Sequence, residues 1–391
     1  MAIPPMKRKF YIIAHNPNTI ADAKAFLEAG ANALEPDVCV SNGQFFISHD
    51  HSAFSNPFTD EHSLVTYLKA LRRLIIAEGG KINLALIMWD FKDPDAPISI
   101  NAFMQIVYDN FAKFPECAGI AMSVTNGSLA HVDFLTKFNP VMSDGHTVTN
   151  VGVGIDEEKA PSDVSTAFAQ GHQARYSYAN GIITTGIKLG VFESMLTAKG
   201  VQATDPGMKL IYTWVMADSA SMRDFLHVGI DGIIVNLGTV PALKAMLLEK
   251  DFAPKFELAK MGYNPWSAPP IPTYFAEIHT ADVNLAGTDA AIQFNLTGTG
   301  GTLSTTLNSD YKDVLEQAHT DFITLDGVNI GTITSLKVTA LTSDISSDWL
   351  PAMIKVTSNA DSNAVFFNYG ADDWLKKGAP LTKAAQAAPT M

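Results

Sequence analysis

The sequence predicts a (β/α)8 barrel followed by an all-β sandwich. Two observations predict the barrel: eight short apolar runs alternate with longer amphipathic runs between residues 9 and 237, and polar side chains follow these runs at their C-terminal ends. A third predicts the sandwich, because after residue 273 the chain is rich in Thr, Asn, Gly and Asp and its apolar residues alternate. An open doubly wound sheet is the alternative for the first part, but AHNPNT is not the glycine-rich loop that fold needs.

The predicted barrel strands are short apolar segments, expected at residues 9–15, 31–40, 82–91, 119–124, 151–155, 181–186, 210–216 and 232–237. Between them, apolar residues recur at helical spacing, most clearly at 19–31, 62–80 and 219–230. The segment SNGQFFISHDH follows the second strand and predicts an extra ribbon that turns at Asn42 and Gly43.

Changes in composition divide the chain into four parts. We expect the barrel at residues 1–250 and a proline-rich tail and linker at 251–272. We expect the sandwich at 273–378 and an unstructured tail at 379–391.

Composition excludes several classes of protein. A formal net charge of −13 disfavours non-specific nucleic-acid binding, which needs a basic surface. No apolar run approaches the roughly 18 residues that span a membrane. The segment MAIPPMKRKFYIIAH lacks the apolar core of a signal peptide, which leaves a cytoplasmic location open. Two cysteines, Cys39 and Cys117, are too few for a disulfide framework, and Cys39 is expected to be a buried free thiol.

Polar residues end several of the predicted strands, so a barrel would bring them to one mouth. They are His15, Glu35, Asp37, Asp90, Lys92, Trp214 and Asn236, together with His49 and His51 at the end of the ribbon. Each alone has a structural reading, since a Glu-x-Asp pair is more often structural and a histidine after an apolar run more often belongs to the core. Their shared placement favours a functional site.

This set of side chains fits metal-assisted phosphodiester cleavage. Three carboxylates are the oxygen ligands that Mg²⁺ prefers, and two histidines titrate near neutrality as nucleophile or base and as general acid. Lys92 suits a phosphate oxygen, Trp214 a quaternary ammonium, and Asn236 a phosphate oxygen or a histidine. Zinc and serine-hydrolase sites are disfavoured, because the sequence lacks His-Glu-x-x-His, Cys-x-x-Cys and Gly-x-Ser-x-Gly.

Five segments together carry a family resemblance: AHNPNTIADAKAFLEAGANALEPDVCV, SHD, WDFKDPD, YTWVMAD and GIDGIIVN. They resemble the sphingomyelinase D/phospholipase D family of the glycerophosphodiester phosphodiesterase superfamily, whose members are TIM barrels. The resemblance covers nearly all of residues 9–240. It implies that His15 and His49 are the catalytic pair. It also implies that one Mg²⁺ is bound by Glu35, Asp37 and Asp90. The implied substrate site consists of Lys92, Trp214 and Asn236.

The same resemblance implies an activity and a location. Members remove the head group from choline-type (lyso)phospholipids or sphingomyelin, often leaving a cyclic phosphate, and a secreted enzyme is expected. The alternatives are an enzyme for soluble glycerophosphodiesters and a non-catalytic lipid-binding protein. Asn16 stands where the general phosphodiesterase branch usually has arginine, and that branch's insertion after the ribbon is missing. Both departures favour the sphingomyelinase D-like branch. The ribbon's loop also lacks the cysteine found in venom enzymes.

The remainder of the chain has resemblances of its own. GYNPWS resembles the tail motif that plugs the far end of the barrel in bacterial and fungal members. FAEIHTADVNLAGTDAAIQFNLTGTGG and SDWLPAMIKV resemble a PLAT (lipoxygenase-homology) domain, which implies docking to lipid or protein and peripheral membrane contact. Asp282, Asp289 and Asp344 are candidate Ca²⁺ ligands there, although acids in solvated loops are the favoured reading. Trp349 and Trp374 are candidates for interface insertion or core packing.

Overall fold

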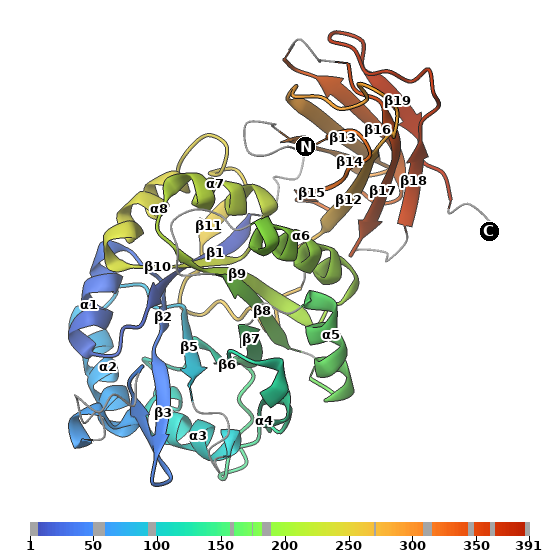
Figure 1. Cartoon of the computed structure of the whole chain (residues 1–391). Helices are drawn as coiled ribbons and strands as arrows, with labels where there is room; N and C mark the ends of the chain where they lie inside the picture. The colour runs from blue at the N-terminus through green and yellow to red at the C-terminus, as the bar shows by residue number, and fades with distance from the viewer. Residues whose placement is uncertain are drawn as a thin grey trace. The chain divides into compact units, whose positions relative to one another are not determined.

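The computed structural model describes residues 7–49, 59–92, 99–156, 160–173, 175–181, 189–269, 271–307, 315–342, 348–359 and 364–387. These residues form two compact units, the first made of 8–201 and 207–269 and the second mainly of 270–391. Figure 1 shows a barrel ringed by helices in the first unit and β-sheets in the second.

The first unit is a closed parallel barrel, as the sequence predicts. β2 continues into β3, and the eight barrel positions are β1 (Arg8–His15), β2 (Ala33–Glu35) with β3 (Asp37–Ser41), β5 (Leu86–Phe91), β6 (Ala121–Asn126), β7 (Val151–Asp156), β8 (Tyr176–Gly181), β9 (Met208–Met216) and β10 (Gly232–Val235). Each strand is parallel to the next, and β10 pairs with β1 to close the barrel. The C-terminal ends therefore share one mouth.

Local capping explains where the helices begin and end. The helices are α1 (Ile20–Ala29), α2 (Leu64–Glu78), α3 (Ile100–Val107), α4 (Val132–Thr136), α5 (Pro161–Gln170), α6 (Leu189–Thr204), α7 (Ser219–Val228) and α8 (Val240–Met246). Thr19 accepts a hydrogen bond from the backbone of Asp22 at the start of α1, and Gly30 ends it with a φ of 112°. Among the described helices, none is long and apolar enough to cross a membrane.

The sixth barrel strand differs from the expectation. It is formed by Tyr176–Gly181, whereas the sequence pattern favoured 181–186, of which 182–188 lie outside the described residues. The segment YSYANG looks too polar for a buried strand, yet all six of its residues are buried. Two of its outward polar groups are paired, because Tyr178 Oη lies 2.5 Å and Asn180 Nδ2 3.0 Å from Ser194 Oγ on α6.

The tail segment completes the barrel, as the resemblance of GYNPWS to a plugging tail motif implies. β11 (Phe256–Leu258) pairs in parallel with β1, and Lys9 forms an ion pair with Glu257. Trp266 is 1% exposed and packs in the barrel core. A Cβ at Gly152 of β7 would lie 2.4 Å from the Trp266 ring, so only glycine leaves room for the indole.

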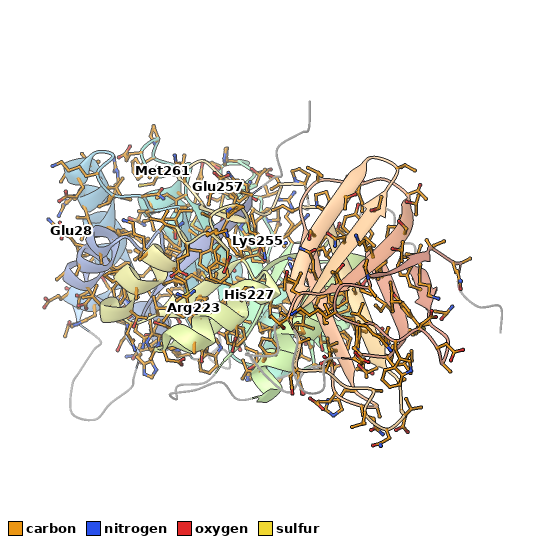
Figure 2. The ribbon with its side chains drawn as sticks, turned by 90° about the horizontal axis from the view of Figure 1, so that it is seen from above. Glu28, Arg223, His227, Lys255, Glu257 and Met261 are labelled. Atoms are coloured by element: carbon orange, nitrogen blue, oxygen red, sulfur yellow. The ribbon has the colours of Figure 1, made fainter. Side chains whose placement is uncertain are left out.

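Trp266→Ala is expected to lower the free energy of unfolding of the barrel by roughly 3–5 kcal/mol, because it leaves a cavity in the core. Calorimetry that resolves the barrel transition measures the change. Met261→Ala, at a position that is 39% exposed in the same tail (Figure 2), is the control and should change it by less than about 0.5 kcal/mol. A loss below about 1 kcal/mol at Trp266 would show that the indole does not fill the core.

The second unit is an antiparallel sandwich, as predicted. Its strands are β12 (Thr273–Thr280), β13 (Ile292–Gly298), β14 (Gly301–Leu307), β15 (Thr320–Asp326), β16 (Ile333–Ala340), β17 (Pro351–Ser358), β18 (Ala364–Asn368) and β19 (Leu381–Ala384). One sheet has the order β15-β12-β17-β18 and the other β14-β13-β16-β19. The expectation of an unstructured tail from residue 379 is wrong at its start, because β19 pairs with β16.

The burial of Trp349 in the sandwich decides between core packing and insertion at an interface. Trp349 is fully buried and donates a hydrogen bond from Nε1 to Thr280 Oγ1 at 3.1 Å, so it is a core residue and does not insert at an interface. Trp374 is only half-buried. Of the acids considered for Ca²⁺, Asp282 accepts a hydrogen bond from Gln317, and Asp344 lies outside the described residues.

Candidate functional site

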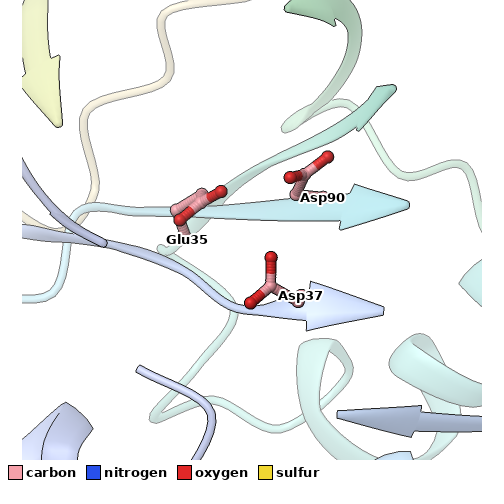
Figure 3. A group of neighbouring side chains, drawn as sticks. All are labelled: Glu35, Asp37 and Asp90. Atoms are coloured by element: carbon pink, nitrogen blue, oxygen red, sulfur yellow. The ribbon is translucent and has the colours of Figure 1, made fainter. Parts of the chain in front are cut away.

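Three carboxylates meet at the mouth of the barrel. Glu35 ends β2, Asp37 begins β3, and Asp90 lies near the end of β5, where it is the register partner of Asp37. Their side chains converge in Figure 3, and one oxygen from each lies within 4.8 Å of the others. Pro36 separates β2 from β3, so the predicted second strand is interrupted between the two acids. Within the described part of the chain, this trio alone could supply three ligands to one metal.

Burial and like charge make this cluster unstable without a cation. Glu35 is 4%, Asp37 0% and Asp90 7% exposed. Burial raises the pKa of Glu35 well above its usual value, and the charges of Asp90 and Asp37 raise it further. Burial also raises the pKa of Asp37. The donor set, all carboxylate oxygen, therefore fits a hard divalent cation such as Mg²⁺.

Lys92 supplies part of the missing positive charge. Its Nζ lies 2.9 Å from Asp37 Oδ1 and also forms an ion pair with Asp90. Burial lowers the pKa of Lys92, but the carboxylates of Asp90, Asp37 and Glu35 outweigh that effect and raise it. One ammonium beside three acids leaves the cluster short of positive charge.

The loop after β1 contributes two asparagines that the sequence analysis did not place in the site. Asn18 Nδ2 donates to Asp37 Oδ2 at 2.6 Å, and the Asp37 backbone N–H donates to Asn18 Oδ1 at 2.9 Å. Asn16 has a φ of 49°, and its backbone N–H donates to Glu35 Oε2 at 3.1 Å. The only sequence signal for this loop is the AHNPNT segment, because asparagine tolerates a left-handed backbone and proline fixes the turn.

The Asn16 side chain also reaches into the cluster. With its nitrogen turned toward the acids, it lies 3.3 Å from Glu35 Oε2 and 3.2 Å from Asp37 Oδ2. The same nitrogen lies 3.2 Å from His15 Nε2. Asn16 therefore connects the carboxylates to the imidazole.

His15 ends β1 and is half-buried beside the acids. Its Nδ1 lies 3.1 Å from Asn236 Oδ1, and an N–H on Nδ1 donating to this oxygen leaves Nε2 unprotonated for chemistry. Burial lowers the pKa of His15, while the hydrogen bond to Asn236 and the charge of Asp37 raise it. The charges of Lys92 and His49 lower it.

The ribbon after β3 presents His49. β4 (Gln44–Ile47) pairs antiparallel with β3 through the predicted turn, where Asn42 and Gly43 have φ values of 50° and 74°. Cys39, a buried free thiol as predicted, donates from Sγ to the carbonyl of Ser48 at 2.9 Å. His49 follows directly and is exposed, while His51 lies outside the described residues.

The opposite side of the mouth carries Trp214, and with it an acid that the sequence analysis missed. Trp214 on β9 is half-buried. Asp156 ends β7, one residue beyond the predicted strand. Burial raises the pKa of Asp156 well above its usual value, Asp90 raises it further, and Lys92 and Trp214 lower it. In the barrel order, β7 with Asp156 lies between β5, which carries Asp90, and β9, which carries Trp214.

Together these groups can act on a phosphate ester. The site combines an unprotonated imidazole, a second imidazole on the ribbon, three acids that fit a hard cation and one ammonium. These are the parts needed to activate a nucleophile, protonate a leaving alcohol and stabilise phosphoryl charge.

Comparisons with known proteins found matches for both parts of the chain. A family model described as "Dermonecrotic toxin SPH" matches residues 5–266, and one described as "PLAT/LH2 domain" matches residues 274–379. Dermonecrotic toxin LbSicTox-alphaIB1a of Loxosceles boneti is 25% identical over 276 residues, covering 66% of this chain and 98% of the toxin. Dermonecrotic toxin LdSicTox-alphaIB1aiv of Loxosceles deserta is 25% identical over 272 residues, with the same coverage.

Among solved structures, coral 8R-lipoxygenase is similar to 29% of this chain, over 17% of its own length, with 22% identity and a TM-score of 0.26. Alpha toxin from Clostridium absonum is similar to 38% of this chain, over 36% of its own length, with 19% identity and a TM-score of 0.25.

Proposed function

The chain belongs to the dermonecrotic toxin SPH family, whose members are phospholipase D-like phosphodiesterases, and we propose that it removes the head group from choline-type (lyso)phospholipids or sphingomyelin. One observation carries the proposal: a buried carboxylate trio lies next to an imidazole whose Nδ1 is held and whose Nε2 faces the trio through Asn16. Phosphodiester cleavage uses every part of this arrangement.

In the proposed reaction, His15 accepts at Nε2 the proton of an attacking hydroxyl that belongs to the lipid itself. The hydroxyl oxygen forms a bond to phosphorus as the bond between phosphorus and the head-group oxygen breaks. His49 donates a proton to that leaving oxygen, so the products are a cyclic phosphate and the free amino alcohol. Proton exchange with water then resets both imidazoles.

We propose that Glu35, Asp37 and Asp90 hold one Mg²⁺. When bound, the ion supplies positive charge for the phosphoryl oxygens. Lys92, which two of the acids engage in the described structure, would then be less tightly held and would contact a phosphate oxygen. Asn236 keeps His15 in the tautomer with Nε2 unprotonated, and Trp214 offers its face to the cationic head group.

A phosphorus NMR time course tests the proposal. Sphingomyelin and lysophosphatidylcholine are incubated with the enzyme, with and without Mg²⁺, and a cyclic phosphate signal is expected only with the metal. Faster turnover of glycerophosphocholine would favour an enzyme for soluble phosphodiesters. No turnover of any of the three would favour a non-catalytic lipid-binding protein.

We further propose that the sandwich docks the enzyme to lipid or to a protein partner and that the enzyme works outside the cell. The PLAT/LH2 match supports the first statement, and the toxin names of the relatives support the second.

The acidic limb of the kcat/KM profile is expected below pH 6.5, because His15 acts as a base and burial lowers its pKa. Activity is then lost as the pH falls through that lowered value. Asn236→Asp places a negative charge at Nδ1, raises the pKa of His15 and should move the limb up by roughly one unit or more. Asn236→Ala, the control, removes a hydrogen bond that raises the pKa and must not move the limb upward. If the acidic limb stays at the same pH in Asn236→Asp, the limb belongs to a group other than His15.

A further inference from the structure

We infer that the side-chain oxygen of Asn16 is a fourth ligand to the cation held by Glu35, Asp37 and Asp90. The inference rests on the proposed function, since it needs the proposed Mg²⁺ site. It deepens that function by giving the loop after β1 a part in binding the metal.

The backbone of this loop holds Asn16 in an unusual conformation. Its φ of 49° is left-handed, although a residue that precedes a proline, here Pro17, normally adopts an extended conformation. The Asn18 backbone N–H donates to the carbonyl of Asn16 at 2.8 Å, and Tyr67 Oη on α2 donates to the carbonyl of Pro17 at 2.9 Å. These contacts hold a conformation from which the side chain reaches the acids, and conformations of this kind concentrate at functional sites.

The end of the Asn16 side chain lies at the distance from the acids that a ligand of the same ion needs. Its inward atom is 3.3 Å from Glu35 Oε2 and 3.2 Å from Asp37 Oδ2. Oxygens bound to Mg²⁺ at about 2.1 Å in octahedral geometry lie about 3 Å from their neighbours. The spacing between the amide and these two carboxylate oxygens is therefore close to that of adjacent ligands.

The amide can present either of its two polar atoms at this point. Without a cation, the nitrogen faces inward, because its N–H groups donate to the carboxylates and an oxygen there would face only acceptors. With a cation among the acids, the oxygen is the favourable atom, and a half-turn of the amide supplies it with little movement of the chain. A neutral oxygen also adds a ligand without adding negative charge to three acids that already repel one another.

The same half-turn changes the surroundings of His15. With the nitrogen inward, the amide donates to His15 Nε2 over a distance of 3.2 Å. With the oxygen inward, this donor is withdrawn, and the oxygen can accept a hydrogen bond from Nε2 once that nitrogen carries a proton. Binding of the cation therefore frees the nitrogen that the proposed reaction uses as a base.

Isothermal titration calorimetry of Mg²⁺ into the full-length protein, at one fixed pH, tests the inference without measuring activity. Asn16→Gly removes the amide, while glycine accepts the left-handed backbone and keeps the N–H that donates to Glu35. We expect its Kd for Mg²⁺ to be at least about tenfold higher than that of the wild type. An amide that only donates to the acids predicts the reverse, because its loss would remove a competitor of the ion.

Asn42→Gly is the matched control, because Asn42 also has a left-handed backbone, with a φ of 50°, at the turn of the ribbon. It should leave the Kd unchanged. Asn16→Asp restores an oxygen at the same position, so its Kd should be equal to or lower than the wild-type value. This variant serves as the test if Asn16→Gly fails to fold.

The outcomes separate the inference from the proposed function. An unchanged or lower Kd in Asn16→Gly, or a higher Kd in Asn16→Asp, would overturn the inference while leaving the three acids as a metal site. No binding of Mg²⁺ by the wild type would overturn both the inference and the proposed metal site.

Discussion

Replacing His15 by alanine is expected to lower kcat/KM for sphingomyelin by roughly 10³-fold or more while the fold persists. The half-buried imidazole is held by Asn236 at Nδ1 and reaches the carboxylate cluster from Nε2 through Asn16, which places its free nitrogen for proton transfer. His49→Ala should give a loss of similar size, because the leaving head group then has no proton donor. Choline release measures both effects.

Three controls make this prediction specific. His146, exposed and stacked on Tyr108, tests the removal of an imidazole far from the mouth, and His146→Ala should retain full activity. Circular dichroism and the Tm should be unchanged in the two site variants. Added imidazole should restore part of the activity of His15→Ala. Full activity of either site variant would exclude the histidine pair.

Removing divalent cations with a chelator is expected to abolish activity, and Mg²⁺ should restore it. Three acids within 4.8 Å of one another, with one lysine, leave no other described source of positive charge for the phosphoryl group. Glu35→Gln should lower activity by a comparable factor and abolish the rise in Tm that Mg²⁺ gives the wild type. Gln293→Glu, on β13 of the second unit, provides a charge-altered control that should respond to Mg²⁺ normally.

The sign of the pH effect on stability distinguishes a metal site from a structural acid cluster. Burial raises the pKa of Glu35 and Asp37 in the folded chain. Without a cation, the folded state is therefore destabilised as the pH rises through those raised values, and Glu35→Gln should lessen that loss. Mg²⁺ requires the ionised acids, so its stabilisation should grow over the same pH range. A Tm insensitive to Mg²⁺ at every pH would contradict the site.

The sequence predicts the acidic half of the site well because short-range patterns encode it. Glu35 and Asp37 are two residues apart, Asp90 and Lys92 likewise, and each pair ends an apolar run. Barrel topology then requires that these ends meet, so the trio follows from strand assignment alone. The roles of His15, His49 and Asn236 stay predictions that the kinetic tests decide.

The other half of the site could not be predicted from the sequence, because the roles of its residues depend on tertiary contacts. Asp156 follows a run of valines and glycines and looks like a loop acid until the register with β8 is known. Tyr176–Gly181 lacks the β-branched residues of a typical buried strand, and its polar groups become acceptable only when α6 supplies Ser194. The AHNPNT pattern indicates a turn at Asn16, but not that its backbone N–H donates to Glu35, which lies 19 residues further along the chain.

The placement of Trp266 has a consequence for the order in which the protein can mature during synthesis. The barrel core remains open at Gly152 until residue 266 has been made, because no earlier residue supplies that indole. A nascent chain that has just emerged through α8 therefore still exposes apolar interior. Only six residues lie between Trp266 and Thr273, the start of β12, so the barrel closes as the sandwich begins to emerge. A chain ended after residue 250 should aggregate, whereas one ended at 269 should fold.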